Sequence, residues 1–440
     1  MRPSKLYSSL LCSALLMLAG VGSLVAQTGT LNQGLESIFS QPFDLSNPTD
    51  TQVVIGIYGG YTAASNGLDQ DYLNTLIFGG FIDEGMKSRV FNRLGDGQNK
   101  VGVGLQSGLR VRVPLGDDPN KQWSILGRVG YRFMQDVGFS KDVFEFLFYG
   151  NAPLAGRTAS LDGLDVHYLV HNHYDLGFAY EQTLGSGGQF RGGLSFGFVQ
   201  GLAQAQAEID GSLFTAAAGE QLDLTTAGYV TASDELTPKL GELSGAGWQF
   251  SARAGLTLPM GERELHIDLS AEDIGRVNWS NPGKRYAVDS LWEFAGFTVD
   301  ELNDLANGSI TGNTDSLLDY LGLEATEGAY NSNMPGLIRA QVSLDDLGGW
   351  MLNLGGHYRM EVSTAPLIYA RGDRFWEKPG IGIGVMAAYG DWGGLQIGTE
   401  LIWQPVDAFV LKTGSSNLLT WLVPNSFTGG FSTLSAAVRW

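Results

Sequence analysis

The sequence is short of cysteine, of charge and of long hydrophobic runs. Its single cysteine is Cys12, so an intramolecular disulfide and cysteine-based zinc or iron–sulfur sites are excluded. The 27 Lys and Arg residues are outnumbered by 46 Asp and Glu residues, for a net charge of −19, which argues against a broad nucleic-acid surface. The 14 prolines beside 62 glycines, with no Gly-X-Y period, exclude a collagen-like or low-complexity chain. Beyond residue 26, no stretch approaches the roughly 18 consecutive apolar residues of a transmembrane helix.

The first 26 residues have the pattern of a secretory signal peptide. Arg2 and Lys5 form a basic start, and an uncharged apolar segment then runs from Leu10 to Val25 before Ala26. This order of basic, apolar and small residues is typical of a segment that is removed on export. A retained membrane anchor is the alternative, although the run is short for a spanning helix.

Alternation of apolar and polar residues is the main signal in the rest of the chain. Between 101 and 115 the apolar residues stand at odd positions, and Gly, Gln and Arg fill most even ones. A strand places odd and even residues on opposite faces. Similar runs of about ten residues recur, long enough for a tilted strand to cross a bilayer. A soluble sandwich also alternates, but its strands average five or six residues.

Two further features favour a membrane barrel over a soluble sandwich. Aromatic residues stand near the ends of the apolar faces, among them Trp123, Trp248, Trp350 and Trp403, as in the aromatic girdles of outer-membrane barrels. The chain also ends in an alternating strand that closes on Trp440, and we interpret Val438 and Trp440 as an assembly signal. We therefore predict an all-β fold, a transmembrane antiparallel β-barrel of about 14 strands with helical loop insertions.

The predicted organisation has three parts. They are a signal peptide at 1–26, an N-terminal segment at 27–50 that is a candidate plug, and an outer-membrane β-barrel at 51–440. Three stretches without strand alternation, 135–163, 208–245 and 281–333, are expected to be loops. Helices are expected at 299–306, after the capping-box match Thr298-x-x-Glu301, and at 315–321.

The chain resembles an uncharacterised family of outer-membrane barrels of Bacteroidota-type bacteria, itself distantly similar to long-chain fatty-acid transporter barrels. The matching motifs are short and spread over most of the mature chain: Asn47-Pro48, Phe148-Tyr149-Gly150-Asn151 with Ala155-Gly156, Glu272-Asp273-Ile274-Gly275 leading to Asn278-Trp279, and the terminal Val438-Arg439-Trp440. Thr49 stands where these transporters usually have a small residue after Asn-Pro. The resemblance implies a barrel and supplies no substrate.

Charged and histidine side chains on the polar strand faces are the candidate functional residues, because a closed barrel encloses that face. Buried charges must be paired or hydrated, so they form either a structural salt-bridge lattice or a selective pore constriction. The predicted lumen-lining residues are Arg110, Arg112, Arg128, Arg132, His167, His171, His173, Arg191, Arg253, Glu264, Asp268, Arg339, Arg359 and Glu400.

Other chemistry receives little support from the sequence. His171 and His173 share a strand face, but no third ligand can be named, so neither a metal site nor a cofactor is predicted. No serine partner is indicated for these histidines, and we predict no enzyme activity and no catalytic residue. Arg371-Gly372-Asp373 matches an adhesion tripeptide, but a motif of three residues often occurs by chance, so no adhesion function is predicted.

The predicted function is passage of a small or amphipathic solute across the outer membrane of a Gram-negative cell, as in a porin-like protein. The alternative is a non-conducting barrel that anchors partners of a secretion or surface-assembly complex. The expected partners are outer-membrane lipid, the barrel-assembly machinery, and a small solute or a secretion partner, with no nucleic acid.

Overall fold

A computed structural model describes residues 52–440, apart from 117, 119, 186, 218–221, 234–242, 281–282, 295–325, 346 and 426–428. The predicted signal peptide at 1–26 and the N-terminal segment at 27–50 lie outside the described residues, as do the helices expected at 299–306 and 315–321. No helix in the described part of the chain is long and apolar enough to cross a bilayer, a result that has no bearing on crossing by strands.

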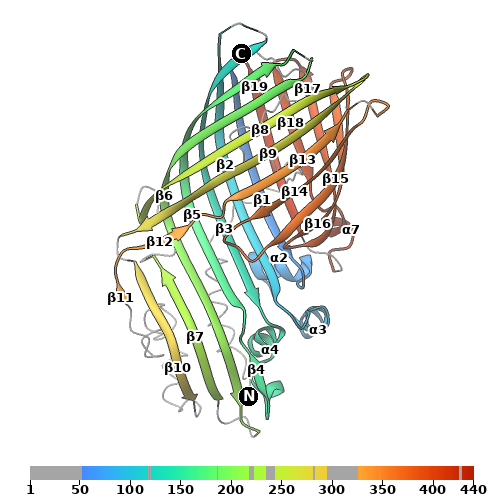
Figure 1. Ribbon diagram of the computed structural model, residues 1–440. Helices are drawn as coiled ribbons and strands as arrows, with labels where there is room; N and C mark the ends of the chain where they lie inside the picture. Colours follow the sequence, from blue (N-terminus) through green and yellow to red (C-terminus); the bar gives the residue numbers. More distant parts are fainter. Residues whose placement is uncertain are drawn as a thin grey trace.

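Antiparallel strands close into a barrel (Figure 1). In ring order they are β1 (Val54–Ser65), β2 (Asn99–Leu115), β3 (Lys121–Phe139), β5 (Leu164–Thr183), β6 (Gln189–Thr215), β8 (Gly245–Met260), β9 (Arg263–Trp279), β13 (Leu337–Leu344), β14 (Met351–Arg359), β15 (Ala365–Trp376), β16 (Ile381–Asp391), β17 (Gly394–Val406), β18 (Phe409–Ser415) and β19 (Gly430–Arg439). The pairing of β1 with β19, from Val54 opposite Arg439 onwards, closes the ring of 14 strands. Closure satisfies the backbone hydrogen bonds of every strand, as a bilayer requires. The predicted fold class is confirmed.

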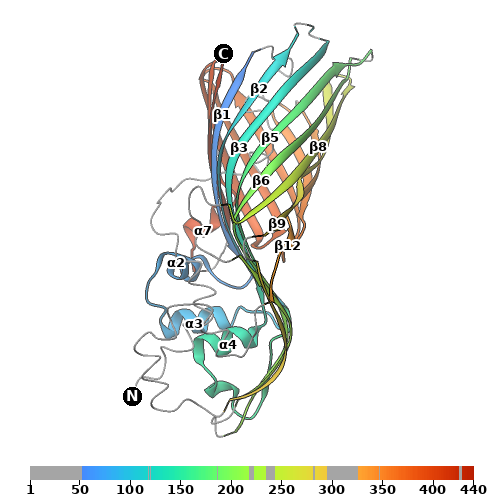
Figure 2. The ribbon, with the colours of Figure 1, turned by 90° about the vertical axis from the view of Figure 1, so that its left-hand side faces the viewer.

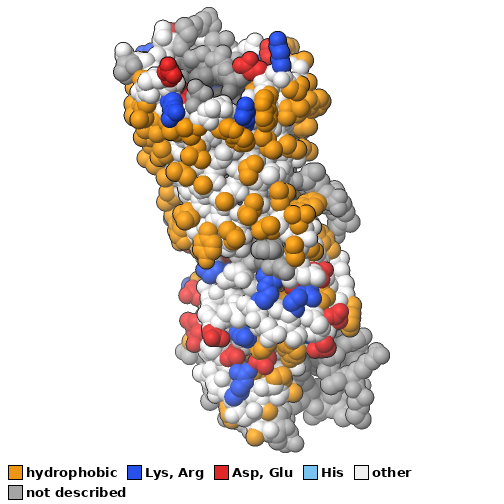
Figure 3. All heavy atoms as spheres, turned by 90° about the vertical axis from the view of Figure 1, so that its right-hand side faces the viewer, with side chains coloured by type: hydrophobic (Ala, Val, Ile, Leu, Met, Phe, Trp, Pro, Cys, Tyr) orange, Lys and Arg blue, Asp and Glu red, His pale blue; other side chains and the backbone are white. Residues whose placement is uncertain are grey.

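The outer face of this ring is apolar. Alternate residues of the barrel strands, such as Ile57, Leu176 and Phe196, are large hydrophobics that are 58–61% exposed. Figure 3 shows them as a broad hydrophobic band over the barrel, with charged side chains gathered towards its two ends. Near the ends of the band, cations lie against aromatic rings, with Arg276 at 5.9 Å from the Trp248 ring and Arg374 at 5.8 Å from the Trp350 ring. The band is therefore bounded by aromatic residues, as the sequence predicted.

One half of the barrel continues beyond the other as a curved sheet (Figures 1 and 2). Strand β6 has 27 residues, whereas β13 and β18 on the other side of the ring have 8 and 7. The first half of β6 pairs with β8 in the barrel, and Ala205–Thr215 pair with β7 (Leu222–Ala232) in the continuation. We call this part, with β4 (Thr158–Ser160), β10 (Lys284–Phe294), β11 (Thr326–Glu327) and β12 (Tyr330–Asn333), the sheet extension.

The structure corrects all three loop predictions. Residues 208–245 and 281–333 were expected to be loops, yet β7, β10, β11 and β12 lie within them and β6 continues to Thr215. In the expected loop 135–163, β3 continues to Phe139 and β4 forms a short strand. The sequences of the sheet extension, such as LDLTTAGYVTA in β7, lack a continuous apolar face. Outside a bilayer no face of the sheet has to be apolar throughout, so the alternation that marks barrel strands disappears.

Helices pack on the face of the sheet extension that continues the outer wall of the barrel. They are α2 (Gln70–Phe78), α3 (Glu84–Phe91) and α4 (Lys141–Tyr149), followed by a short 3₁₀ turn η1 (Ala152–Leu154) (Figure 2). Their apolar side chains, including Tyr72, Val90 and Phe144, form a buried core with Val101 of β2. The predicted fold class includes helical loop insertions, and α4 is one within the expected loop 135–163, whereas α2 and α3 lie where no loop was predicted.

Side-chain caps fix where these helices begin. Ser140 accepts a hydrogen bond from Val143 N at the start of α4. Asp69 does the same for Tyr72 N at the start of α2 and binds Arg89 of α3 at 2.9 Å through its other oxygen. That hydrogen bond raises the pKa of Arg89 above its ordinary value. The helix pair is thereby tied together at one carboxylate.

The two ends of the barrel differ in their connections. At the end that holds the C-terminus, the strands are joined by turns of two to six residues (Figure 1). At the opposite end lie the long connections, including the helices, the sheet extension and the four-residue helix α7 (Leu419–Leu422). We call these the short-turn end and the long-loop end.

Candidate functional site

The structure places the predicted lumen-lining residues on the inner faces of the barrel strands. The four arginines of β2 and β3, the three histidines of β5 and Glu400 are buried, and the others are partly buried except Glu264, which is exposed at the short-turn end. Val438 is half exposed on the outer face of β19, and Trp440 is almost fully exposed. Their reading as an assembly signal stays a prediction.

A buried ionic cluster joins strands that are not neighbours in the ring. Arg128 of β3 binds Asp175 of β5 at 2.7 Å and Asp273 of β9 at 2.5 Å, and Arg132 reaches the same Asp273 at 3.0 Å. Gln249 of β8 donates to Asp175 at 2.6 Å. Strands β5, β6 and β8 stand between β3 and β9 in the ring, so the Arg128–Asp273 contact passes through the lumen.

A β-bulge brings Asp273 into this cluster. The register of β9 shifts opposite β8 between Phe250 and Ala252, and Asp273 has φ 57°. A bulge places two successive residues on one side of the strand, and here Glu272 and Asp273 are both buried. The sequence analysis assigned lumen-lining residues by alternation and therefore did not include Asp273. The sequence signal that could have pointed to Asp273 is the family motif Glu272-Asp273-Ile274-Gly275, to which it belongs.

A second ionic cluster lies on the β14–β17 side of the barrel. Arg371 binds Glu400 at 2.9 Å and Asp373 through its Nε, and Asn353 donates to Asp373 at 2.7 Å. In the tripeptide Arg371-Gly372-Asp373, both charged side chains therefore bind residues of the barrel strands and are not presented on the outer surface. Both clusters leave their charges paired, as burial requires.

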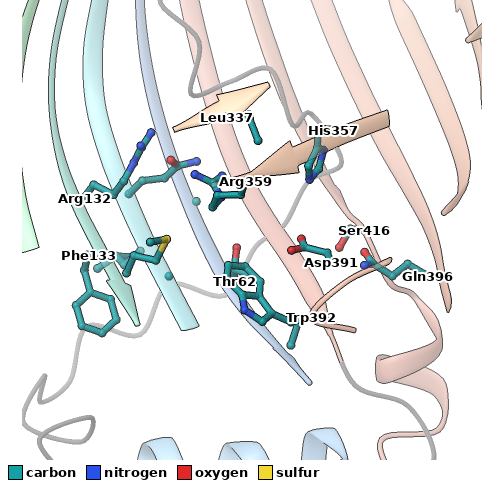
Figure 4. A pocket seen from close by; sticks show the side chains of 16 residues that line it. Thr62, Arg132, Phe133, Leu337, His357, Arg359, Asp391, Trp392, Gln396 and Ser416 are labelled. Carbon is teal, nitrogen blue, oxygen red and sulfur yellow. The ribbon is translucent and has the colours of Figure 1, made fainter. Parts of the chain in front are cut away.

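The histidines of β5 lie close to the first cluster. The His171 and His173 rings are 5.9 Å apart between centroids, and Tyr58 Oη lies 3.4 Å from His173 Nε2. All three β5 histidines are buried. His357 of β14 also faces the lumen, where Figure 4 shows it beside Arg359.

Two turns of the long-loop end reach across the lumen and contact the opposite wall. Trp392, in the β16–β17 turn, is buried and donates its indole N–H to Asp136 of β3. The other oxygen of Asp136 accepts from Ser363 N of the β14–β15 turn at 2.7 Å, and Ser363 Oγ donates to Asp165 at 2.7 Å. We call this set of contacts the cross-lumen latch.

Glycine makes the close approach of Trp392 feasible. A Cβ at Gly102 of β2 would lie 2.2 Å from two atoms of the indole ring. That distance is far inside van der Waals contact. The indole therefore occupies space that any other residue at 102 would fill.

A pocket lies in the lumen beside the latch (Figure 4). About 760 Å³ of empty space lies within it, a volume that includes open solvent. Arg132 stands on one wall, His357 and Arg359 on another, and Trp392 lies beside Thr62 (Figure 4). The lining also includes Met134, Leu337, Asp391 and Gln396. The pocket thus combines apolar surface with two guanidinium groups and one carboxylate.

Comparison with known families gives one match. The profile described as "Family of unknown function (DUF5723)" matches residues 57–365, more than half of the chain. The chain belongs to this family. The sequence-based resemblance to an uncharacterised barrel family is confirmed to that extent, and the bacterial group stays a prediction. No curated protein sequence matches the chain significantly.

Solved structures similar to this chain are barrels with low sequence identity. The Pseudomonas putida toluene transporter TodX is 9% identical, with a TM-score of 0.41 and coverage of 94% of each chain. A Pseudomonas aeruginosa FadL homologue is 10% identical, with a TM-score of 0.42 and coverage of 90% of this chain and 93% of that one. The translocator domain of the autotransporter NalP from Neisseria meningitidis is 9% identical, with a TM-score of 0.34 and coverage of 90% and 91%. These values are too low to assign a function.

Proposed function

We propose that this barrel passes a small or amphipathic solute across the outer membrane of a Gram-negative cell. The observation that carries the proposal is the lumen pocket, whose lining joins apolar side chains to Arg132 and Arg359. Arg359 and Arg132, whose charge Asp273 already balances, present guanidinium groups to an anionic or polar group of a solute, and the apolar lining favours a hydrocarbon body.

The direction of insertion follows from the lengths of the connections. Outer-membrane barrels have short periplasmic turns and longer extracellular loops. We infer that the short-turn end faces the periplasm and that the sheet extension stands outside the cell. Trp392 and the cross-lumen latch then separate the pocket from the extracellular side, and a solute passes when the two turns move.

Uptake by proteoliposomes tests this function, with benzoate as a small amphipathic anion. Vesicles that contain the wild-type barrel should take up benzoate faster than protein-free vesicles, and Arg359→Gln should slow this uptake. Arg276→Gln is the matched control, because Arg276 lies on the outer face against the Trp248 ring. Uptake no faster than in protein-free vesicles would contradict the proposal.

A second function is favoured by the sheet extension. A helix-backed sheet beyond the membrane band offers a surface to a protein partner, and it supports a non-conducting barrel that anchors a secretion or surface-assembly complex. Co-purification from detergent-solubilised membranes distinguishes the two functions. A stoichiometric partner that is lost when the β7 segment is deleted, together with absent benzoate uptake, would favour the anchoring function.

A further inference from the structure

Three potential metal ligands meet at the short-turn end of the barrel, away from the latch and the ionic clusters. Glu264 and His266 belong to β9, and Asp345 directly follows β13, which pairs with β9. His266 Nε2 lies 3.9 Å from Glu264 Oε2 and 4.0 Å from Asp345 Oδ2. One ligand atom from each residue lies within 4.8 Å of the other two.

Two of the three ligands are oriented by their other polar atom. His266 Nδ1 lies 2.9 Å from Thr257 Oγ1, and Asp345 Oδ1 accepts the backbone N–H of Glu264 at 2.5 Å. When Nδ1 donates its proton to Thr257, the imidazole presents an unprotonated Nε2, which is the form that binds a metal. Because Oδ1 of Asp345 is held by the backbone N–H of Glu264, its other oxygen, Oδ2, faces Nε2 of His266.

The separations suit a shared ion better than direct hydrogen bonds. Distances of 3.9 and 4.0 Å exceed hydrogen-bond range. Two ligands that each bind zinc at about 2.0–2.2 Å are separated by at most about 4.4 Å, so a small closure brings all three to one ion. Glu264 can supply this closure because its side chain is 51% exposed.

The local charge also favours a cation. Among the described residues, neither Glu264 nor Asp345 has an arginine or lysine partner within 4.0 Å. In this part of the chain the two carboxylates therefore have no arginine or lysine to balance them, and a cation beside His266 would do so. One nitrogen and two oxygen ligands match the preferences of zinc.

We propose that Glu264, His266 and Asp345 bind one zinc ion at the short-turn mouth of the barrel, with water as the fourth ligand. The site lies at the opposite end of the barrel from the latch, and none of its three residues lines the pocket. Zinc there would cross-link β9 to the connection that follows β13.

Zinc titration of the full mature chain in detergent tests the proposal. Isothermal calorimetry should show one zinc per barrel, and Co²⁺ in place of Zn²⁺ should give the intense visible absorption of a four-coordinate site. His266→Ala and the near-isosteric Asp345→Asn should each weaken zinc binding at least ten-fold. His357→Ala is the matched control, since this histidine lines the pocket and should leave zinc affinity unchanged.

Two results would overturn the proposal. One is a wild-type barrel that binds no zinc at 100 µM, and the other is unchanged zinc affinity in both His266→Ala and Asp345→Asn. Heat-dependent mobility on gels verifies that each variant is folded. Benzoate uptake is measured on the same preparations, so failure of the metal site and failure of the transport function are recorded separately.

Discussion

The cross-lumen latch predicts that one added methyl group opens the barrel. In Gly102→Ala the new Cβ would lie 2.2 Å from the Trp392 indole, whereas carbon atoms in contact stand about 3.5–4.0 Å apart. The ring must therefore withdraw by about 1.3 Å or more, which breaks its hydrogen bond to Asp136. A hydrogen bond to a charged group contributes about 1.5–3 kcal/mol, and its loss raises the ratio of open to closed barrels by roughly 10- to 150-fold.

Single-channel recording in planar bilayers measures this ratio directly. Gly104→Ala is the matched control, because Gly104 lies two residues away on the same face of β2 and its Cβ would meet no atom closer than 3.6 Å. Gly102→Ala should raise the open probability by at least an order of magnitude, and Gly104→Ala should leave it at the wild-type value. Equal open probability in the wild type and both variants would refute the assignment of Trp392 as a closure.

Three other predictions concern stability and orientation. Asp273→Ala leaves two buried guanidinium groups without their shared carboxylate and should lower the free energy of unfolding in lipid vesicles by about 3–5 kcal/mol. The control is Glu84→Gln, which removes an exposed ion pair with Lys87 on α3 and should cost less than about 1 kcal/mol. Similar losses for both variants would disprove the role of the first ionic cluster. Ser140→Ala removes the N-terminal cap of α4 and should lower the stability of this helix by about 1 kcal/mol. The sheet extension should then be digested faster by protease while the barrel stays intact. Unchanged proteolysis would argue against a stabilising effect of the cap. An epitope tag at 160–163, at the long-loop end, should be labelled by antibody on intact cells, and a tag at 184–188, at the short-turn end, should not. Labelling of the 184–188 tag instead would reverse the orientation.

The barrel itself was predictable because lipid imposes a strict period on the strands that cross it. Every barrel strand must be apolar on its outer face, so residues such as Ile57 and Leu176 recur at alternate positions. The sheet extension obeys no such rule. Strand β7 has small and polar residues on both faces, and it was therefore predicted as part of a loop.

The candidate site was predictable only in part, for the same reason. Alternation predicts which face of a strand each residue lies on, and so it predicted that the arginines of β2 and β3 face the lumen. It does not predict which residues bind one another across the lumen. Asp273 escaped because a bulge shifts the period at its position. Trp392 and Ser363 lie in turns, where the alternation of strand residues does not predict which way a side chain points. Their contacts with Asp136 also depend on closure of the barrel, which brings strands distant in sequence together.

The central claim is that one face of the strands touches hydrocarbon while the other is enclosed in the barrel. Spin labels on β1 test it most directly, and the lone cysteine Cys12 precedes the predicted cleavage site. In lipid vesicles, a label at Ile57→Cys should collide with oxygen dissolved in the bilayer and be shielded from a water-soluble nickel chelate. A label at Thr62→Cys, which lines the pocket, should be shielded from the lipid. Strong exposure of the Ile57→Cys label to the nickel chelate would contradict the account.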